Sequence, residues 1–251
     1  MKPLIEIKNV CKRFGGVVAA NDICLNIMPG EVRGLIGPNG SGKTTLLNLI
    51  NGIYQVDSGN IIFNGEDITK APSHKRARQG IGRTFQTPRF LKRSTIEDNL
   101  LLGKDLADQL GFANSFFGKK GTDFKNELEI LMDVAGFDFN QDDDIGSLPF
   151  GKQKLLEIVR AMLTSPKLLL LDEPAAGTNS SEYANIVNFI NLASQRGIAV
   201  LLIEHVMELV MNVCHNITVL SFGKVIADGT PEEVRSSEAV IEAYLGRAGN
   251  A

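Results

Sequence analysis

The sequence lacks the features that mark several classes of protein. Its 251 residues include no tryptophan and only three cysteines, Cys11, Cys24 and Cys214, and no pair has the C-x-x-C spacing of a zinc or redox site. This odd number gives no disulfide framework, and free thiols in a reducing compartment are the simplest expectation. The most apolar runs, 168–171 and 198–203, have the length of strands, whereas a membrane-spanning helix needs about 20 apolar residues.

The charge balance excludes a further class. Lys plus Arg is 26 and Asp plus Glu is 29, a net charge of −3, whereas a general nucleic-acid binder usually carries a basic excess. Residues 1–8 hold no apolar stretch of signal-peptide length, so we expect any role at a membrane to depend on docking to a protein that spans it. Glycine is abundant, at 25 residues, which directs attention to tight turns and phosphate-binding loops.

The apolar pattern predicts an α/β protein in which residues 1–251 form one domain. The predicted strands are 4–10, 23–27, 31–36, 61–63, 81–85, 167–172, 198–203 and 217–221. The last three alternate with helical segments, which favours a mainly parallel sheet. Asn64-Gly65 is typical of a hairpin turn, and Thr95 and Thr230 are predicted helix N-caps.

The middle of the chain differs from its two ends. We interpret residues 87–165 as a helical subdomain inserted into the α/β core, with helices at 123–135 and 154–162 and an irregular loop at 111–121. The segment 87–99 mixes apolar Phe90, Leu91 and Ile96 with basic Arg89, Lys92 and Arg93. That composition suits a groove for a partner helix, and the alternative is a loop that packs on its own subdomain.

A glycine-rich segment carries the clearest chemistry. Residues 37–44 fit the pattern G-x-x-x-x-G-K-S/T and lie between a predicted strand and a predicted helix. Glycines let the main chain wrap round phosphates, Lys43 neutralises the β and γ oxygens, and Thr44 offers a hydroxyl to Mg²⁺. We therefore expect an ATP-binding loop rather than a chance glycine turn. Its residues are Gly37, Pro38, Asn39, Gly40, Ser41, Gly42, Lys43, Thr44 and Thr45.

A second motif supports the first. Four leucines at 168–171 lead into Asp172 and Glu173. A buried parallel strand of this kind would deliver Asp172 to the shell of a Mg²⁺ ion, through a bound water, and would place Glu173 to polarise the attacking water. The alternative is a buried strand followed by two ordinary loop acids, and the phosphate loop in the same chain favours the functional interpretation.

The order of these motifs resembles the nucleotide-binding subunit of an ATP-binding-cassette transporter, over nearly the whole length. The resemblance implies that Gln86 in Arg83-Thr84-Phe85-Gln86 is the Q-loop glutamine, which contacts Mg²⁺ and signals toward the membrane partner. It also implies that His205 is the switch histidine and that Phe14 stacks on adenine. Taken singly, a Phe such as Phe14 is more often an ordinary core aromatic, and a His such as His205 is more often an ordinary partly buried histidine.

The family signature Leu-Ser-Gly-Gly-Gln is altered in this chain. At the matching place stand Leu148, Pro149, Phe150, Gly151, Lys152 and Gln153. The signature normally presents a hydroxyl and N–H groups to ATP held by the opposite subunit, and Pro149 removes the hydroxyl and one N–H. Asn179 likewise stands where the family's D-loop has Asp.

These departures resemble one subgroup, the larger ATPase subunit of bacterial branched-chain amino acid importers, with urea and other amide importers close by. The resemblance implies a P-loop ATPase with an antiparallel β subdomain, a RecA-like parallel core and an inserted helical subdomain. It further implies ATP and Mg²⁺ as cofactors, a second ATPase subunit in a homo- or heterodimer, two transmembrane permease subunits and an extracytoplasmic substrate-binding protein. The chain would then lie peripherally on the cytoplasmic face of the membrane.

Three alternative functions use the same P-loop chemistry. The nearest is an exporter, which would use the same kind of ATPase subunit. A soluble clamp on DNA or ribosomes is disfavoured because the chain has no coiled coil, tandem cassette or basic excess, so no nucleic-acid partner is expected. A metabolic P-loop kinase is disfavoured by the order of Gln86, the signature and His205.

Overall fold

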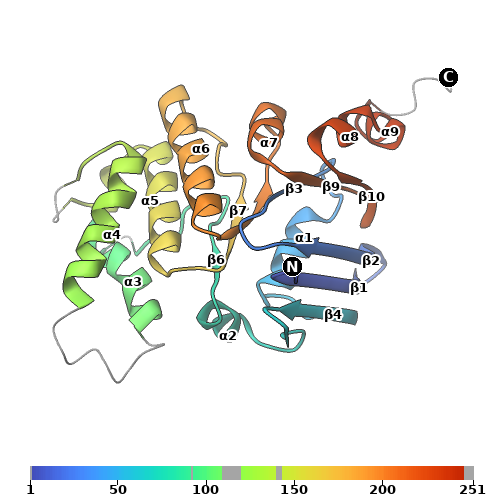
Figure 1. The fold of residues 1–251 in the computed structure, drawn as a ribbon, viewed down its shortest axis with the longest axis horizontal. Coiled ribbons are helices and arrows are strands. Elements are labelled where there is room, and N and C mark those ends of the chain that lie inside the picture. Colours follow the sequence, from blue (N-terminus) through green and yellow to red (C-terminus); the bar gives the residue numbers. More distant parts are fainter. Residues whose placement is uncertain (1, 92, 109–119, 140–142, 246–251) are drawn as a thin grey trace.

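Two β-sheets organise the chain in the computed structural model, which describes residues 2–91, 93–108, 120–139 and 143–245 (Figure 1). The smaller sheet is antiparallel, in the order β2-β1-β4-β5. Its strands are β1 (Ile5–Phe14), β2 (Val17–Ile27), β4 (Ser58–Phe63) and β5 (Glu66–Asp67). Asn64 and Gly65 join β4 to β5 at positive φ, 50° and 82°, as a type I′ hairpin turn requires.

The larger sheet has the order β10-β9-β3-β8-β7-β6. Its strands are β3 (Val32–Ile36), β6 (Ile81–Arg83), β7 (Leu168–Asp172), β8 (Ala199–Ile203), β9 (Asn216–Ser221) and β10 (Lys224–Gly229). All neighbours run parallel except β9 and β10, so the predicted parallel core is confirmed. The hairpin strand β10 was not predicted.

The helices divide between the sheets and one end of the molecule. They are α1 (Lys43–Ile50), α2 (Ser73–Arg78), α3 (Ile96–Asp108), α4 (Lys120–Ala135), the 3₁₀ helix η2 (Ile145–Ser147), α5 (Phe150–Leu163), α6 (Ser180–Gln195), α7 (Met207–Val213), α8 (Pro231–Ser236) and α9 (Glu238–Leu245). In Figure 1, α3, α4 and α5 gather at the end far from the antiparallel sheet, and α8 and α9 lie beside β9 and β10. Within the described ranges, no helix is long and apolar enough to cross a bilayer.

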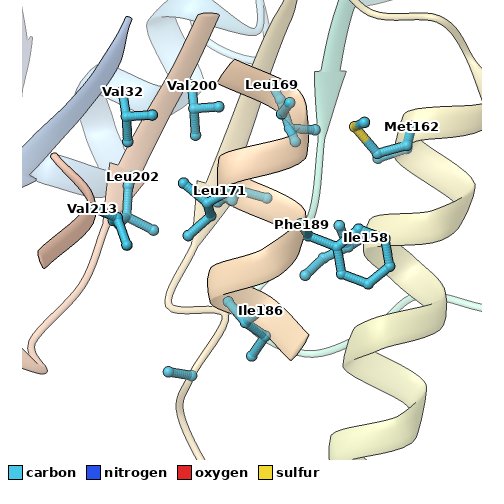
Figure 2. Close-up of a cluster of buried hydrophobic side chains, with 14 of the residues drawn as sticks. Val32, Ile158, Met162, Leu169, Leu171, Ile186, Phe189, Val200, Leu202 and Val213 are labelled. Atoms are coloured by element: carbon cyan, nitrogen blue, oxygen red, sulfur yellow. The ribbon is translucent and has the colours of Figure 1, made fainter. Parts of the chain in front are cut away.

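The parallel strands are buried on both faces because their side chains alternate between two cores. Leu169 and Leu171 of β7 join the core under α5, α6 and α7, where Figure 2 draws them with Phe189 of α6 and Ile158 of α5. Leu168 and Leu170 join the second core, which α1 shares with the antiparallel sheet. Burial on both faces explains why these strands read as continuous apolar runs.

Local signals set several helix boundaries. The Thr95 hydroxyl accepts a hydrogen bond from the Asp98 N–H (3.1 Å), and Thr230 forms a capping box with Glu233, so both predicted N-caps are confirmed. The predicted start of the signature helix at residue 154 is wrong. This helix, α5, begins at Phe150 because the extended Pro149 serves as its N-cap.

Two further expectations concern the segment between α3 and α5. Of the loop predicted at 111–121, residues 111–119 lie outside the described residues. Lys120 and Gly121 belong to α4, which begins before the predicted residue 123. The short helix α2 was not predicted at all.

Arg76 of α2 binds the carboxyl-terminal end of α1 through hydrogen bonds inside the core. It is fully buried, and its guanidinium donates to the carbonyls of Leu49 (2.6 Å), Ile50 (2.9 Å), Thr69 (3.0 Å) and Ala71 (2.8 Å). Burial lowers its pKa to about 10, so it stays charged at neutral pH. Two of these carbonyls end α1, where a helix leaves its carbonyls unpaired and favours a cation.

Replacing Arg76 by Met is expected to destabilise the fold. The change leaves four carbonyls without their donor and should lower the free energy of unfolding by about 3 kcal/mol. Urea denaturation of the variant and of Lys75→Met, a matched change at the exposed neighbour on α2, makes the measurement. The control should stay within about 0.5 kcal/mol of the parent. Equal midpoints for the two variants would contradict the assignment.

Candidate functional site

Parallel pairing brings the predicted site segments to one edge of the sheet. In the register of the strands, Leu35 of β3 lies beside Ile203 of β8, and Ile203 lies beside Asp172 of β7. The three strands therefore end at the same level. The glycine-rich loop, Glu173 and His205 all follow directly, at the carboxyl edge where open α/β sheets bind ligands.

The glycine-rich loop folds as a cradle in front of α1. Gly37, Gly40 and Gly42 all have positive φ, and a Cβ on Gly37 or Gly42 would overlap the carbonyl of Leu220 or Ala19. Only glycine therefore fits at these two positions. Lys43 is buried, and its ammonium donates to the carbonyls of Gly37 (2.8 Å) and Pro38 (3.0 Å), so it lies across the loop.

The polar groups of this loop suit a phosphate chain. The hydroxyl of Ser41 is buried and has no hydrogen-bond partner, and Thr44 exposes its side chain at the start of α1. Burial lowers the pKa of Lys43, while Glu173 and Asp172 oppose that shift. An unpaired buried hydroxyl, a cation and a helix N-terminus together favour an anionic ligand with several oxygens.

Three predicted residues meet around one carboxylate. Glu173 accepts a hydrogen bond from the Gln86 side-chain amide at Oε2 (2.8 Å), and its Oε1 lies 3.0 Å from Nε2 of His205. Glu173 has a left-handed backbone, with φ of 50°, and its N–H donates to the Ile203 carbonyl (2.9 Å). This conformation turns the chain sharply after β7 and directs the carboxylate toward Gln86 and His205. The group can orient a water and accept its proton.

Arg83 is a site residue that the sequence analysis missed. Its guanidinium pairs with the Asp172 carboxylate (3.2 Å) and donates to the Asn48 side chain of α1 (2.7 Å). Burial raises the pKa of Asp172, and Arg83 opposes that rise. The single sequence signal is its position three residues before Gln86, which by itself does not identify a partner.

Phe14 lies apart from the core, at the end of β1. Its ring is 42% exposed and contacts Tyr54 edge to face, with ring centroids 5.1 Å apart. The ammonium of Lys12 lies 5.4 Å from the same ring. The core alternative is therefore wrong for Phe14, and the exposed face is open to a planar ligand. Tyr54 was not predicted.

The altered signature begins α5. Pro149 is the N-cap and supplies no side-chain hydrogen bond, Phe150 is exposed, and Gln153 donates to the Leu148 carbonyl (2.9 Å). A Cβ on Gly151 would overlap the Glu182 carboxylate, which closes the α6 capping box with Asn179. Asn179 therefore has a clear local role as the N-cap of α6.

Two lysines of this segment lie against the chain itself. The ammonium of Lys152 packs over the Phe137 ring at 4.9 Å, and that of Lys154 donates to the main-chain carbonyl of Glu173. Lys154 is buried, which lowers its pKa. The signature helix is thereby joined to the loop after β7.

The oxygen-bearing side chains at this edge of the sheet decide whether the predicted Mg²⁺ fits the site. Within the described ranges, no three His, Cys, Asp or Glu side chains cluster as a metal cage. Mg²⁺ does not need one, because it keeps several waters and takes its other oxygens from substrate phosphates and one or two protein groups. The exposed Thr44 hydroxyl, Asp172 and the Gln86 amide oxygen are the residues at this edge that fit such partial coordination.

The comparisons with known proteins agree with this geometry. The family model described as "ABC transporter" matches residues 20–176, and that described as "Branched-chain amino acid ATP-binding cassette transporter" matches residues 224–250. A solved structure described as the ADP conformation of an ATP-binding cassette of an ABC transporter has a TM-score of 0.83 and 32% identity, covering 98% of this chain and 100% of its own. The chain therefore belongs to the ABC transporter family, and it is an ATPase.

The names of its curated relatives also state what those proteins transport. The high-affinity branched-chain amino acid transport ATP-binding protein BraF of Pseudomonas aeruginosa is 40% identical over 255 residues, covering 98% of this chain and 99% of that protein. The corresponding protein LivG of Escherichia coli K12 is 35% identical, with 98% and 99% coverage. The resemblance and the fold class expected from the sequence motifs are both confirmed.

Lys43→Ala is expected to abolish useful ATP binding. The loss of one charge-assisted contact to phosphate, about 1.5–3 kcal/mol, weakens binding by about 10- to 100-fold. Equilibrium titration with a fluorescent ATP analogue measures the dissociation constant. Lys167→Ala, at an exposed lysine before β7, is the control and should bind like the parent. An unchanged constant for Lys43→Ala would remove the role given to the loop.

Proposed function

We propose that this chain is the ATP-hydrolysing subunit of an importer of branched-chain amino acids, attached to the cytoplasmic face of a membrane. The observation that carries the chemistry is the convergence of Lys43, Asp172, Glu173 and His205 at one sheet edge. The substrate is suggested by the names of the relatives and by the family match at 224–250. Leucine, isoleucine or valine should therefore stimulate ATP hydrolysis in the assembled transporter, and urea or an amide should not.

The site residues would act in sequence on bound ATP. The loop of residues 37–45 binds the phosphates, Lys43 offsets their charge, and Phe14 stacks on the base. Mg²⁺, when bound through Thr44, Gln86 and water on Asp172, would neutralise charge that develops on the phosphates. Glu173 orients the attacking water and accepts its proton, while His205 and Gln86 hold the carboxylate in place by their contacts with it.

The second half of each ATP site is expected from another chain. We propose that two ATPase subunits, identical or paralogous, close head to tail around two ATP molecules. The segment 148–153 then faces the ATP of the opposite subunit. Pro149 contributes no hydroxyl there, so the N–H groups at the start of α5 and the helix N-terminus carry this contact.

The membrane partner is expected at residues 87–99, within the 87–165 segment that we take as the inserted helical subdomain. The structure corrects part of the original composition argument, because Ile96 is fully buried and Phe90 packs on the core beneath Arg160. Arg89, Leu91 and Arg93 are exposed, and Lys92 lies outside the described residues.

A cavity lined by Phe85, just before this segment, and by Arg160, which donates to the Arg89 carbonyl, supports the docking proposal. Its volume is about 340 Å³, and it opens between α2, α3 and α5. Its lining includes Asn51, Ala77, Phe85, Leu102, Arg160 and Thr164. A partly apolar groove with a basic rim suits a short amphipathic helix. We propose that a cytoplasmic loop of one permease subunit docks here and that a second permease subunit docks on the other ATPase subunit, with an extracytoplasmic binding protein supplying the amino acid.

Glu173→Gln is expected to keep ATP binding and stop turnover. The amide preserves the shape of the side chain but does not accept a proton from water. ATP should then hold two chains together, which gel filtration with ATP would detect as a dimer. Glu208→Gln, an exposed carboxylate three residues after His205, is the matched control and should hydrolyse ATP normally. Parent-like hydrolysis by Glu173→Gln would overturn its role.

Disulfide cross-linking tests the docking segment. A cysteine at Arg93 should cross-link to the cytoplasmic loops of the co-purified membrane subunit, and a cysteine at Lys224, on β10, should not. Cys24 is exposed and Cys11 is partly exposed, so both are first replaced by serine. Cys214 can stay, because burial raises the pKa of its thiol to about 12 and keeps it protonated. Cross-links from position 224 alone would place the partner elsewhere.

A further inference from the structure

A buried carboxylate in the middle of α5 holds the segment that carries Gln86. The two oxygens of Glu157 accept hydrogen bonds from the main-chain N–H groups of Phe85 (3.2 Å) and Arg89 (3.3 Å). These two residues lie on either side of Gln86. Nothing in the sequence marks Glu157, which sits in the same apolar helix as the core residues around it.

The charge of Glu157 is compensated locally. Arg160, one turn further along α5, lies 3.6 Å from the Glu157 carboxylate, and its guanidinium also donates to the Arg89 carbonyl (2.7 Å). Burial raises the pKa of Glu157, whereas the two N–H groups and Arg160 oppose that rise. A buried carboxylate that is paired and doubly hydrogen-bonded is costly to disturb, because removing it leaves its partners unsatisfied.

Side-chain stacking braces the same segment. The Phe85 ring contacts two guanidinium groups, those of Arg83 and Arg89, which lie 4.8 Å and 4.6 Å from its centroid. Arg83 is anchored on Asp172, so one end of the segment is tied to β7, and Glu157 ties both ends to α5. Pro88 donates no N–H, which leaves few other main-chain donors to hold this stretch.

We propose that Glu157 is a positioning residue for ATP hydrolysis, which ties the Gln86 segment to the signature helix. Because α5 begins at Phe150 and carries Glu157 two turns later, the signature and the Gln86 amide move as one unit. The amide then meets the Glu173 carboxylate only when α5 is in place. The inference rests on the role proposed for Gln86.

The chemistry of the contact predicts a graded series. A carboxylate accepts one N–H at each oxygen, glutamine accepts at one oxygen only, and alanine accepts at neither. Glu157→Ala should therefore lower kcat by about tenfold or more, and Glu157→Gln by less, while KM for ATP stays within about twofold because neither change touches the phosphate loop. Glu129→Gln, at an exposed carboxylate of α4, is the matched control and should equal the parent.

The measurement uses the full chain in the transporter purified with its membrane subunits. The rate is divided by the concentration of sites that bind fluorescent ATP, so that misfolded protein does not count. A lower kcat per binding site, in the order Ala below Gln below the parent, supports the proposal. Unchanged kcat per binding site in both variants overturns it, whatever happens to their melting temperatures.

A fluorescence probe reads the position of the segment directly. The chain has no tryptophan, so Phe90→Trp, beneath Arg160, gives a single emitter without background. Adding Glu157→Ala should raise acrylamide quenching of this tryptophan, whereas adding Glu129→Gln should leave quenching unchanged. Equal quenching in all three proteins overturns the proposal.

The variant Gln86→Ala distinguishes a failure of the role proposed for Gln86 from a failure of the role proposed for Glu157. If Gln86→Ala leaves kcat unchanged, the role proposed for Gln86 fails. If Gln86→Ala lowers kcat and Glu157→Ala does not, the positioning role of Glu157 alone fails. In the double variant the two losses should not add, because both act through the same amide.

Discussion

This site depends on one constraint, which is that three parallel strands end at the same level of the sheet. β3, β8 and β7 pair so that Leu35, Ile203 and Asp172 lie side by side, and the chain leaves each strand at the same edge. That register brings the phosphate loop, Glu173 and His205 to one edge, where the Glu173 carboxylate and the His205 ring are then in contact. A shift of one residue in β7 would send Asp172 and its apolar neighbours to the wrong faces of the sheet.

Around this edge the protein gathers several partly buried charges and pairs nearly every one of them. Asp172 lies against Arg83, Lys154 against the Glu173 carbonyl, and Glu157 against Arg160. The first pair joins β7 to β6 and the second joins α5 to the loop after β7, whereas the third lies within α5. Pairing is required because an isolated charge at this depth would cost several kcal/mol. The contacts that offset the cost of burying these charges also connect the sheet edge that carries Glu173 to the helical end of the molecule.

The features that could be predicted from the sequence are those that depend on residues close together in the chain. Residues 37–45, the leucine run before Asp172, and the Thr95 and Thr230 caps depend on neighbours in the chain, and each was predicted correctly as a structural element. Arg83, Tyr54 and Glu157 were missed because their partners are distant in sequence, 72 residues in the case of Glu157 and Phe85. In the segment 87–99, composition likewise failed to predict which side chains contact distant parts of the chain. Its composition suggested an exposed apolar face, yet Phe90 and Ile96 pack inward, and composition does not tell which side of a loop is covered.

The left-handed backbone of Glu173 has a consequence for the evolution of this chain. A non-glycine residue at φ of 50° carries strain of roughly 1 kcal/mol, which glycine or asparagine at the same position would relieve. In the role proposed for Glu173, selection for a more stable protein and selection for faster hydrolysis pull in opposite directions at this single position. A lineage that no longer needed hydrolysis here would gain stability by losing the carboxylate.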